Sequence, residues 1–319
     1  MTWLKLEDVK KHYPVKTGFF SSETRLLKAV DGVGFEVGRG ECLGLVGESG
    51  CGKTTLGRLI LDLERPTGGR IFFDDRDIRK MNGPEKKTFR RRVQIIFQDP
   101  YSSLNPRHNV GSIIEEPLII HRRGDQEQRQ ARVLELMAEV GLLPEHYRRY
   151  PHEFSGGQRQ RVGIARALAL GPELVVADEP VSALDVSIQA QVINLLKELQ
   201  AKFNLTYVFI AHDLSLVRHV SDRVAVMYLG RLVEIIPRLD FGRAEHHPYT
   251  QALLNSIPLP KPWARKAASP LIGDVPSPLD PPPGCRFHTR CPERIEICRR
   301  ETPELKEVSS GRLVACHRR

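Results

Sequence analysis

Apolar residues between positions 3 and 236 follow two alternating patterns. Short runs rich in Val, Ile, Leu and Phe lie at residues 41–46, 93–97, 173–177, 205–211 and 223–229, each followed by polar or glycine-rich sequence. Such runs are typical of buried strands, and the sequence between them is helical in pattern. The alternation predicts an α/β fold in which helices cover a sheet that is largely parallel.

The strand pattern stops between residues 99 and 166. Within this region residues 126–140 have helical periodicity, and one apolar stripe is formed by Val133, Leu134, Met137 and Val140. We therefore expect a helical subdomain at about 99–166, inserted into a main domain of residues 1–245.

The composition changes again after residue 245. Residues 258–283 are rich in proline, which favours an extended segment. A group of cysteines follows this segment. We expect residues 246–319 to form a small C-terminal extension of the main domain.

The overall composition suits a globular protein with one large domain and an appendage, since 40% of the 319 residues are apolar and 27% are charged. No run approaches the roughly 18 consecutive apolar residues of a membrane-spanning helix, and the first residues lack an apolar secretory core. We therefore expect a cytoplasmic chain. The formal charge of +9 is compatible with a nucleic-acid or anionic-membrane partner, but no base-reading motif accompanies it, which favours a solvated basic surface.

Residues 47–54 match the pattern G-x-x-x-x-G-K-[ST], between an apolar strand and a helical pattern that begins near Thr55. Glycines let the backbone turn tightly, so that its N–H groups surround phosphate oxygens at a helix N-terminus. Lys53 adds positive charge at the β- and γ-phosphates, and Thr54 offers a hydroxyl to Mg²⁺. The residues expected to bind the nucleotide here are Gly47, Glu48, Ser49, Gly50, Cys51, Gly52, Lys53, Thr54 and Thr55.

Two acids, Asp178 and Glu179, follow the buried-type run at 173–177. Functional groups of α/β sheets gather at the carboxyl ends of strands. We expect Asp178 to bind Mg²⁺ through water and Glu179 to polarise the water that attacks the γ-phosphate. On their own, the two acids also fit a solvent-exposed strand end.

The segment Ser155-Gly156-Gly157-Gln158 opens a helical pattern. Ser155 is suited to cap this helix, and the two glycines leave N–H donors exposed at the positive end of the helix dipole. The sequence therefore predicts an anion-binding helix start.

Several further segments, taken in their order along the chain, resemble the motif set of ABC ATPases. They are Tyr13 near the start, Gln98 in IIFQDP, residues 154–158, residues 182–185 and His212 in FIAHD. The resemblance implies a P-loop NTPase fold of the ABC type that binds and hydrolyses ATP with Mg²⁺. It also implies that Tyr13 stacks on adenine, that Gln98 senses Mg²⁺ and the attacking water, and that His212 contacts the γ-phosphate.

In this family the helix start at Ser155 caps the γ-phosphate held by a second ATPase domain, and Asp185 shapes the contact between the two. The resemblance therefore implies a head-to-tail dimer with two ATP molecules at its interface. Phe154 replaces the Leu of many members, and the residues expected to face the phosphate are unchanged. We expect a competent composite site in which Glu179, Gln98 and His212 are catalytic and water attacks in line.

The C-terminal part resembles the extension of peptide-importer ATPases, especially the dipeptide-type subunit. The likeness rests on HPYT at residues 247–250, on GDVPSPLDPPP at 273–283 and, near the start, on KKHYPVKTGFF at 10–20. It implies a peripheral subunit on the cytoplasmic face of the inner membrane. The implied partners are a sister ATPase, two integral permeases and an extracytoplasmic peptide-binding protein, with no nucleic acid.

Four cysteines, Cys285, Cys291, Cys298 and Cys316, supply thiolates within a short segment. In a cytosolic chain such a group suggests a metal before disulfides, as a tetrahedral S4 set or a four-iron cluster. The spacing differs from the paired C-x2-C of common zinc sites. The family likeness favours a [4Fe–4S] cluster that staples the small lobe, with zinc or metal-free thiols as alternatives.

The sequence also fits other interpretations. Nickel and opine importers share the same tail, and one sequence does not name the transported solute or a peptide's length. A soluble ABC protein acting on ribosomes or DNA fits the basic charge, but such members carry two cassettes or a long coiled-coil insertion, which this chain lacks. An exporter subunit is disfavoured by the HPYT tail. The second ATPase is either another copy or a sister chain, and the family favours a sister.

Overall fold

The structure is a computed structural model. It describes residues 2–16, 24–242, 245–256 and 273–319. Two predicted segments fall partly outside the described residues, namely the end of the KKHYPVKTGFF segment and most of the proline-rich stretch at 258–283.

The described chain forms two compact units. One unit contains residues 38–42 and 80–210, and the other contains residues 2–37, 43–79 and 211–319. The predicted helical insertion lies in the first unit and the predicted C-terminal extension lies in the second. The boundary expected after residue 245 therefore falls inside a compact unit, and the division at that residue stays a prediction.

The first unit contains parallel strands in the order β8-β7-β6. These are β6 (Val93–Ile96), β7 (Leu174–Asp178) and β8 (Thr206–Ala211), and β7 and β8 are buried along their whole length. Burial on both faces explains why these strands appear in the sequence as continuous apolar runs. The three strands predicted for this region are confirmed.

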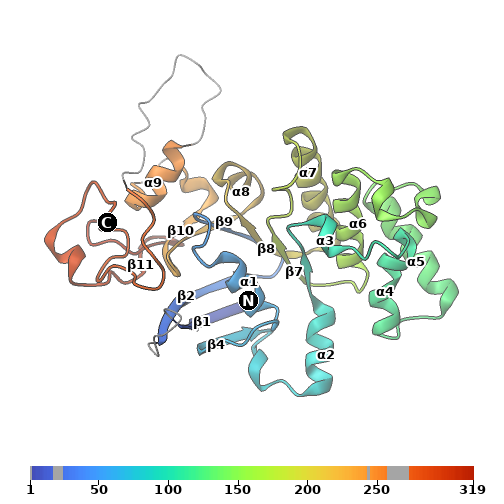
Figure 1. The fold of residues 1–319 in the computed structure, drawn as a ribbon, viewed down its shortest axis with the longest axis horizontal. Coiled ribbons are helices and arrows are strands. Elements are labelled where there is room, and N and C mark those ends of the chain that lie inside the picture. The colour runs from blue at the N-terminus through green and yellow to red at the C-terminus, as the bar shows by residue number, and fades with distance from the viewer. Residues whose placement is uncertain (1, 17–23, 243–244, 257–272) are drawn as a thin grey trace, which may run out of the picture. The chain divides into compact units, whose positions relative to one another are not determined.

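Helices make up the rest of the first unit. The α-helices are α2 (Gly83–Arg92), α3 (Pro100–Ser103), α4 (Val110–Ile120), α5 (Gln126–Glu139), α6 (Gly156–Leu168) and α7 (Val186–Phe203), and two 3₁₀ turns are η2 (Pro144–Arg148) and η3 (Pro151–Glu153). In Figure 1 the green helices α4, α5 and α6 lie together, and α4 packs against the other two. Val133, Met137 and Val140 are buried as the predicted stripe requires, but Leu134 is 37% exposed, so the stripe is wrong at that residue. The helices agree with the predicted helical insertion, and its division as a subdomain at 99–166 stays a prediction.

The second unit contains a four-stranded sheet in the order β2-β1-β4-β5, in which β4 pairs antiparallel with β1 and with β5. Its strands are β1 (Thr2–Lys16), β2 (Thr24–Gly38), β4 (Gly68–Phe73) and β5 (Arg76–Asp77). β1 pairs with β4 in a register that sets Leu4 opposite Phe73 and Leu6 opposite Ile71. These four side chains are buried, so the apolar face of this sheet contributes to the core of the unit.

The second unit also contains strands in the order β11-β12-β10-β9-β3. They are β3 (Cys42–Val46), β9 (Arg223–Tyr228), β10 (Arg231–Pro237), β11 (Lys306–Ser309) and β12 (Arg312–Val314). β3 and β9 are parallel, as predicted, whereas β10, β12 and β11 continue antiparallel. The C-terminal hairpin thus adds strands to a sheet that begins in the main domain.

The remaining elements of the second unit are short helices. They are α1 (Lys53–Ile60), α8 (Leu214–Val220) and α9 (Pro248–Asn255), with 3₁₀ turns η1 (Ile78–Lys80), η4 (Arg238–Asp240) and η5 (Glu296–Arg299). No helix within the described residues is both long enough and apolar enough to cross a membrane.

Candidate functional site

The loop between β3 and α1 has the backbone that the glycine pattern predicts. A Cβ atom on Gly47 would lie 2.1 Å from the carbonyl oxygen of Met227, and one on Gly52 would lie 2.0 Å from that of Ala29. Gly52 is also the N-cap of α1, with φ of 105°, a conformation that L side chains rarely adopt. Glycine is therefore required at both ends of this phosphate-binding loop.

Lys53 begins α1 and points back into the loop. Its Nζ donates to the carbonyl oxygens of Gly47 at 2.8 Å and Glu48 at 3.1 Å, and the residue is only 5% exposed. The buried ammonium and the helix N-terminus make this loop electropositive, which suits the β- and γ-phosphates of a nucleotide. Thr54 and Thr55 follow on the first turn of α1.

The acidic pair lies at the carboxyl end of β7, as predicted. Asp178 is the last residue of the strand and is 8% exposed, and Glu179 follows it with a φ of 45°. The Glu179 N–H donates to the carbonyl of Ile210 at 2.9 Å, which fixes this strained backbone. Gln98 Nε2 donates to the Glu179 carboxylate at 3.0 Å. The structure thus brings together two of the three side chains predicted to be catalytic.

The predicted anion-binding helix start is the N-terminus of α6. Ser155 is its N-cap, and its hydroxyl accepts from the Gln158 N–H while the Gln158 side chain accepts from the Ser155 N–H. A Cβ on Gly157 would lie 2.5 Å from Cγ2 of Ile188 in α7, so glycine is needed there for packing. The capped helix start agrees with the sequence, and contact with a second subunit's phosphate stays a prediction.

The remaining predicted residues occupy exposed or half-buried positions. Asp185 is the N-cap of α7, and His212 follows the end of β8. The Tyr13 hydroxyl donates to Glu64, and the Lys11 ammonium lies 4.9 Å from the centre of the Tyr13 ring. One ring face thus contacts a cation, and the predicted stacking on adenine stays a prediction.

Two family models match this chain. The model described as ABC transporter matches residues 30–182, and the one described as oligopeptide/dipeptide transporter, C-terminal region, matches residues 233–298. The chain is 54% identical to the oligopeptide transport ATP-binding protein AppF of Bacillus subtilis, covering 99% of this chain and 97% of that protein. It is also 54% identical to the dipeptide transport ATP-binding protein DppF of Escherichia coli, covering 98% and 93%.

The chain belongs to the ABC transporter ATP-binding family. Among solved structures it resembles the dimeric ATP-binding cassette MJ0796 in a post-hydrolysis state with ADP and phosphate, at 32% identity and a TM-score of 0.65. That match covers 74% of this chain and 98% of the other. The predicted P-loop NTPase fold of the ABC type is therefore confirmed.

The structure does not show the metal centre predicted at the four C-terminal cysteines. Within the described residues, no group of three or more His, Cys, Asp or Glu side chains is arranged to hold a metal ion. Burial, together with the nearby Cys298, Cys316 and Cys291, raises the pKa of the Cys285 thiol to about 11. Burial also raises the pKa of Cys291 and of Cys316. A [4Fe–4S] cluster or zinc at these cysteines stays a prediction.

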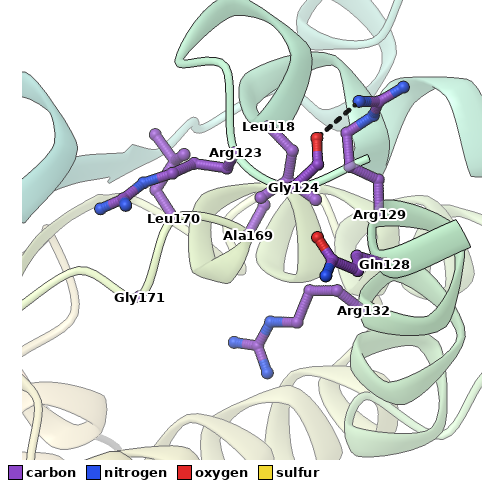
Figure 2. Close-up of a pocket in the computed structure, with 9 residues that line it drawn as sticks. All are labelled: Leu118, Arg123, Gly124, Gln128, Arg129, Arg132, Ala169, Leu170 and Gly171. Atoms are coloured by element: carbon purple, nitrogen blue, oxygen red, sulfur yellow. Dashed lines mark hydrogen bonds between the residues drawn. The ribbon is translucent and has the colours of Figure 1, made fainter. Parts of the chain in front are cut away.

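The cavity in Figure 2 lies among the helices of the first unit and includes none of the predicted site residues. It has a volume of about 340 Å³. Arg129 donates to Glu115 at 2.8 Å and to the Gly124 carbonyl at 2.9 Å, and Arg132 donates to Glu135 at 2.8 Å. These guanidinium groups therefore already have partners. The lining consists of Leu118, Arg123, Gly124, Gln128, Arg129, Arg132, Ala169, Leu170 and Gly171.

Proposed function

We propose that this chain is the ATP-hydrolysing subunit of an ABC importer that takes up dipeptides or oligopeptides. Relatives named as oligopeptide and dipeptide transport ATP-binding proteins match it over nearly their whole length. The peptide-transporter C-terminal model supports the same substrate class. The single observation that carries the enzymatic part is the contact between Gln98 and the Glu179 carboxylate beyond β7.

The proposed reaction is attack of water on the γ-phosphorus of ATP. The Glu179 carboxylate accepts a proton from the attacking water, and the bond from the γ-phosphorus to the bridging oxygen breaks, which releases ADP and phosphate. Gln98 orients Glu179 through its amide N–H. Lys53 and the loop amides stabilise the charge on the phosphates, so catalysis comes from positioning and electrostatics. His212 is proposed to contact the γ-phosphate.

The residues present also fit a magnesium nucleotide. Gly47 and Gly52 leave no room for a Cβ atom and so maintain the tight turn of the loop, and the Lys53 ammonium is buried in the same loop. Thr54, Asp178 and Gln98 are the proposed Mg²⁺ partners. The ion, when bound, neutralises charge on the β- and γ-phosphates.

The proposed assembly is a head-to-tail dimer of ATPase subunits on the cytoplasmic face of the inner membrane, in which Ser155, Gly156, Gly157 and Gln158 face the partner's ATP. The dimeric cassette at 32% identity supports the dimer. Two permeases and an extracytoplasmic peptide-binding protein complete the importer, and nucleic acid has no part in it. Exposed apolar side chains of the helical subdomain, Tyr101, Ile119 and Ile120, suit contact with a permease.

Replacing Glu179 with Gln tests the proposed function. The variant keeps the size and the left-handed backbone position but cannot accept the proton. We expect ATP binding within about twofold of wild type and ATP turnover lowered at least about 100-fold in the assembled transporter. Peptide uptake into vesicles should be lost in parallel. Undiminished turnover would remove Glu179 from catalysis, and uptake of a nickel complex but no peptide would overturn the substrate class.

No step of this proposal passes through an iron–sulfur cluster. No metal-binding group is seen among the residues that the structure describes, so the cluster predicted at Cys285, Cys291, Cys298 and Cys316 stays a prediction. Iron and acid-labile sulfide can be assayed on anaerobically purified protein, with zinc measured in parallel. Finding iron and sulfide together would confirm the prediction made from the cysteines and the family likeness, and finding neither would contradict it.

A further inference from the structure

The phosphate-binding loop is contacted by side chains from the C-terminal extension. The N–H of Glu48, the second residue of the loop, donates to the Tyr249 hydroxyl at 2.9 Å. The Arg290 guanidinium donates to both carboxylate oxygens of Glu48, at 2.7 and 3.1 Å. One residue of the loop is thus held through its backbone and its side chain by groups 201 and 242 positions away in the sequence.

These contacts are sheltered from water. The Arg290 side chain is 6% exposed and that of Glu48 is 25% exposed. Tyr249 is fully buried, with its ring centre 4.7 Å from that of Tyr228 and 5.3 Å from that of Phe287. A bidentate ion pair of this burial fixes geometry more firmly than an exposed one, because solvent screens it less and both N–H donors must align.

The C-terminal extension also reaches the phosphate-binding loop through the turn between β9 and β10. Arg286 donates to the Leu229 carbonyl and to the Asp31 carboxylate. The next residue, Gly230, donates its N–H to the Cys51 carbonyl in the loop at 2.9 Å. Leu229 has a φ of 42°, a position that non-glycine residues adopt only when their surroundings impose it. The extension thus also contacts the turn that abuts the middle of the loop.

We propose that Tyr249 and Arg290 are positioning residues of the phosphate-binding loop, which set Glu48 so that the loop amides face the phosphates of ATP. The inference rests on the proposed ATP-binding function and assigns part of that site to the C-terminal extension. If either contact is lost, the loop populates other arrangements, and apparent affinity falls with the fraction of binding-competent molecules. The loop meets the phosphates both before and during the reaction, so the effect falls on KM and not on kcat.

The test uses two variants of the full-length chain. Tyr249→Phe removes one hydroxyl and keeps the packed ring, and Arg290→Met removes the guanidinium and keeps an unbranched side chain. Affinity is measured with a fluorescent ATP analogue, and KM and kcat come from basal ATP hydrolysis. We expect Kd and KM to rise about fivefold for Tyr249→Phe and about tenfold or more for Arg290→Met. In both variants kcat should stay within about twofold of wild type.

A third variant tests whether Arg290 acts through Glu48. The double variant Glu48→Gln with Arg290→Met should bind ATP no more weakly than Arg290→Met, because it no longer leaves a half-buried carboxylate without its partner. Arg290→Lys should recover part of the affinity, since it restores the charge but not the two-pronged geometry. If the loss of ATP affinity in the double variant equals the sum of the losses in Glu48→Gln and Arg290→Met alone, the assignment to Glu48 is wrong.

Two matched controls identify nonspecific effects. Arg300→Met removes an exposed arginine of the same extension, which pairs only with Glu296 at 3.0 Å among the ion pairs of the described residues. Tyr207→Phe removes the hydroxyl of a buried tyrosine that has no hydrogen-bond partner within the described residues. Both should bind ATP like wild type. Lowered melting temperatures with unchanged Kd for Tyr249→Phe and Arg290→Met would overturn the inference, whereas a wild-type chain that does not bind ATP would instead remove the proposed function.

Discussion

Replacing Gly52 with Ala tests the steric argument for the phosphate-binding loop. The added Cβ would lie 2.0 Å from the Ala29 carbonyl oxygen and 2.9 Å from the Met227 methyl group. It would also sit at a φ of 105°, where any L side chain is strained. Two separate penalties therefore fall on this one substitution, a clash and a backbone strain.

The two penalties can be estimated separately. A non-glycine residue in a sparsely populated backbone region costs about 1–3 kcal/mol, and forcing an extra carbon into a packed site costs about 1–3 kcal/mol more. We expect Gly52→Ala to lower the free energy of unfolding by about 4 kcal/mol. Gly50→Ala is the matched control, because Gly50 has a φ of 77° but a Cβ atom added to it would have no atom of the described residues within 4 Å. It carries the strain alone, about 1–2 kcal/mol.

Urea unfolding followed by far-ultraviolet circular dichroism measures both losses. With unchanged slopes, the midpoint of Gly52→Ala should lie below that of Gly50→Ala by about 0.5–1 M urea. The comparison cancels the shared effect of removing a glycine from the unfolded chain. Midpoints that agree within error would show that the Ala29 carbonyl yields easily, and the argument that close approach requires Gly52 would be wrong.

Three further predictions each follow from the surroundings of a single residue. Gly157→Ala places a Cβ 2.5 Å from Ile188 Cγ2 and should destabilise the folded chain by about 1–3 kcal/mol in thermal melts. Adding Ile188→Ala should remove that penalty, and a penalty that persists would show that the clash lies elsewhere. Burial lowers the pKa of His247 from 6.5 to about 4. Between these two pH values the unfolded chain binds a proton at this residue and the folded chain does not. The stability present above pH 6.5 should therefore fall by up to about 3 kcal/mol between pH 6.5 and 4. His247→Asn, which keeps an acceptor for the Tyr249 N–H, should flatten this part of the stability profile, and an unchanged profile would exclude His247 as its source. Tyr207→Phe should be neutral or stabilising by up to about 1 kcal/mol in urea unfolding, because it removes a buried hydroxyl without a partner in the described residues, and a clear loss of stability would contradict this.

Sequence predicts the buried strands well because burial on both faces leaves continuous apolar runs. The runs at 41–46 and 173–177 correspond to β3, which begins one residue later, and to β7, which begins and ends one residue later. The apolar pattern of the sequence does not reveal α2, because its sequence GPEKKTFRRR has one buried apolar side chain, Phe89, and hence no apolar stripe. That helix depends on its start, where the Asn82 side chain accepts from the Glu85 N–H and the Glu85 side chain accepts from the Asn82 N–H.

The candidate site likewise contains a part that the sequence predicts and a part that it does not. The loop from Gly47 to Thr54 is recognisable because its chemistry is local in the sequence. The sequence marks Tyr249 only as part of HPYT and does not mark Arg290 at all, because the contacts of these residues with Glu48 depend on how distant segments pack. The sequence shows how many cysteines could bind a metal, but their spacing does not determine how the thiols are arranged in space or whether they are ionised.

Strained backbone occurs where function is proposed in both units. Glu179 and Leu229 have φ values of 45° and 42°, and each directly follows a buried strand, β7 or β9. Such strain persists only when the surroundings fix it, and here the Ile210 carbonyl binds the Glu179 N–H while Arg286 binds the Leu229 carbonyl. The proposed base and the turn beside the phosphate-binding loop are therefore positioned by groups that need not touch ATP. Substitutions at such supporting groups should alter ATP hydrolysis through geometry, which is why the C-terminal extension belongs in any account of the nucleotide site.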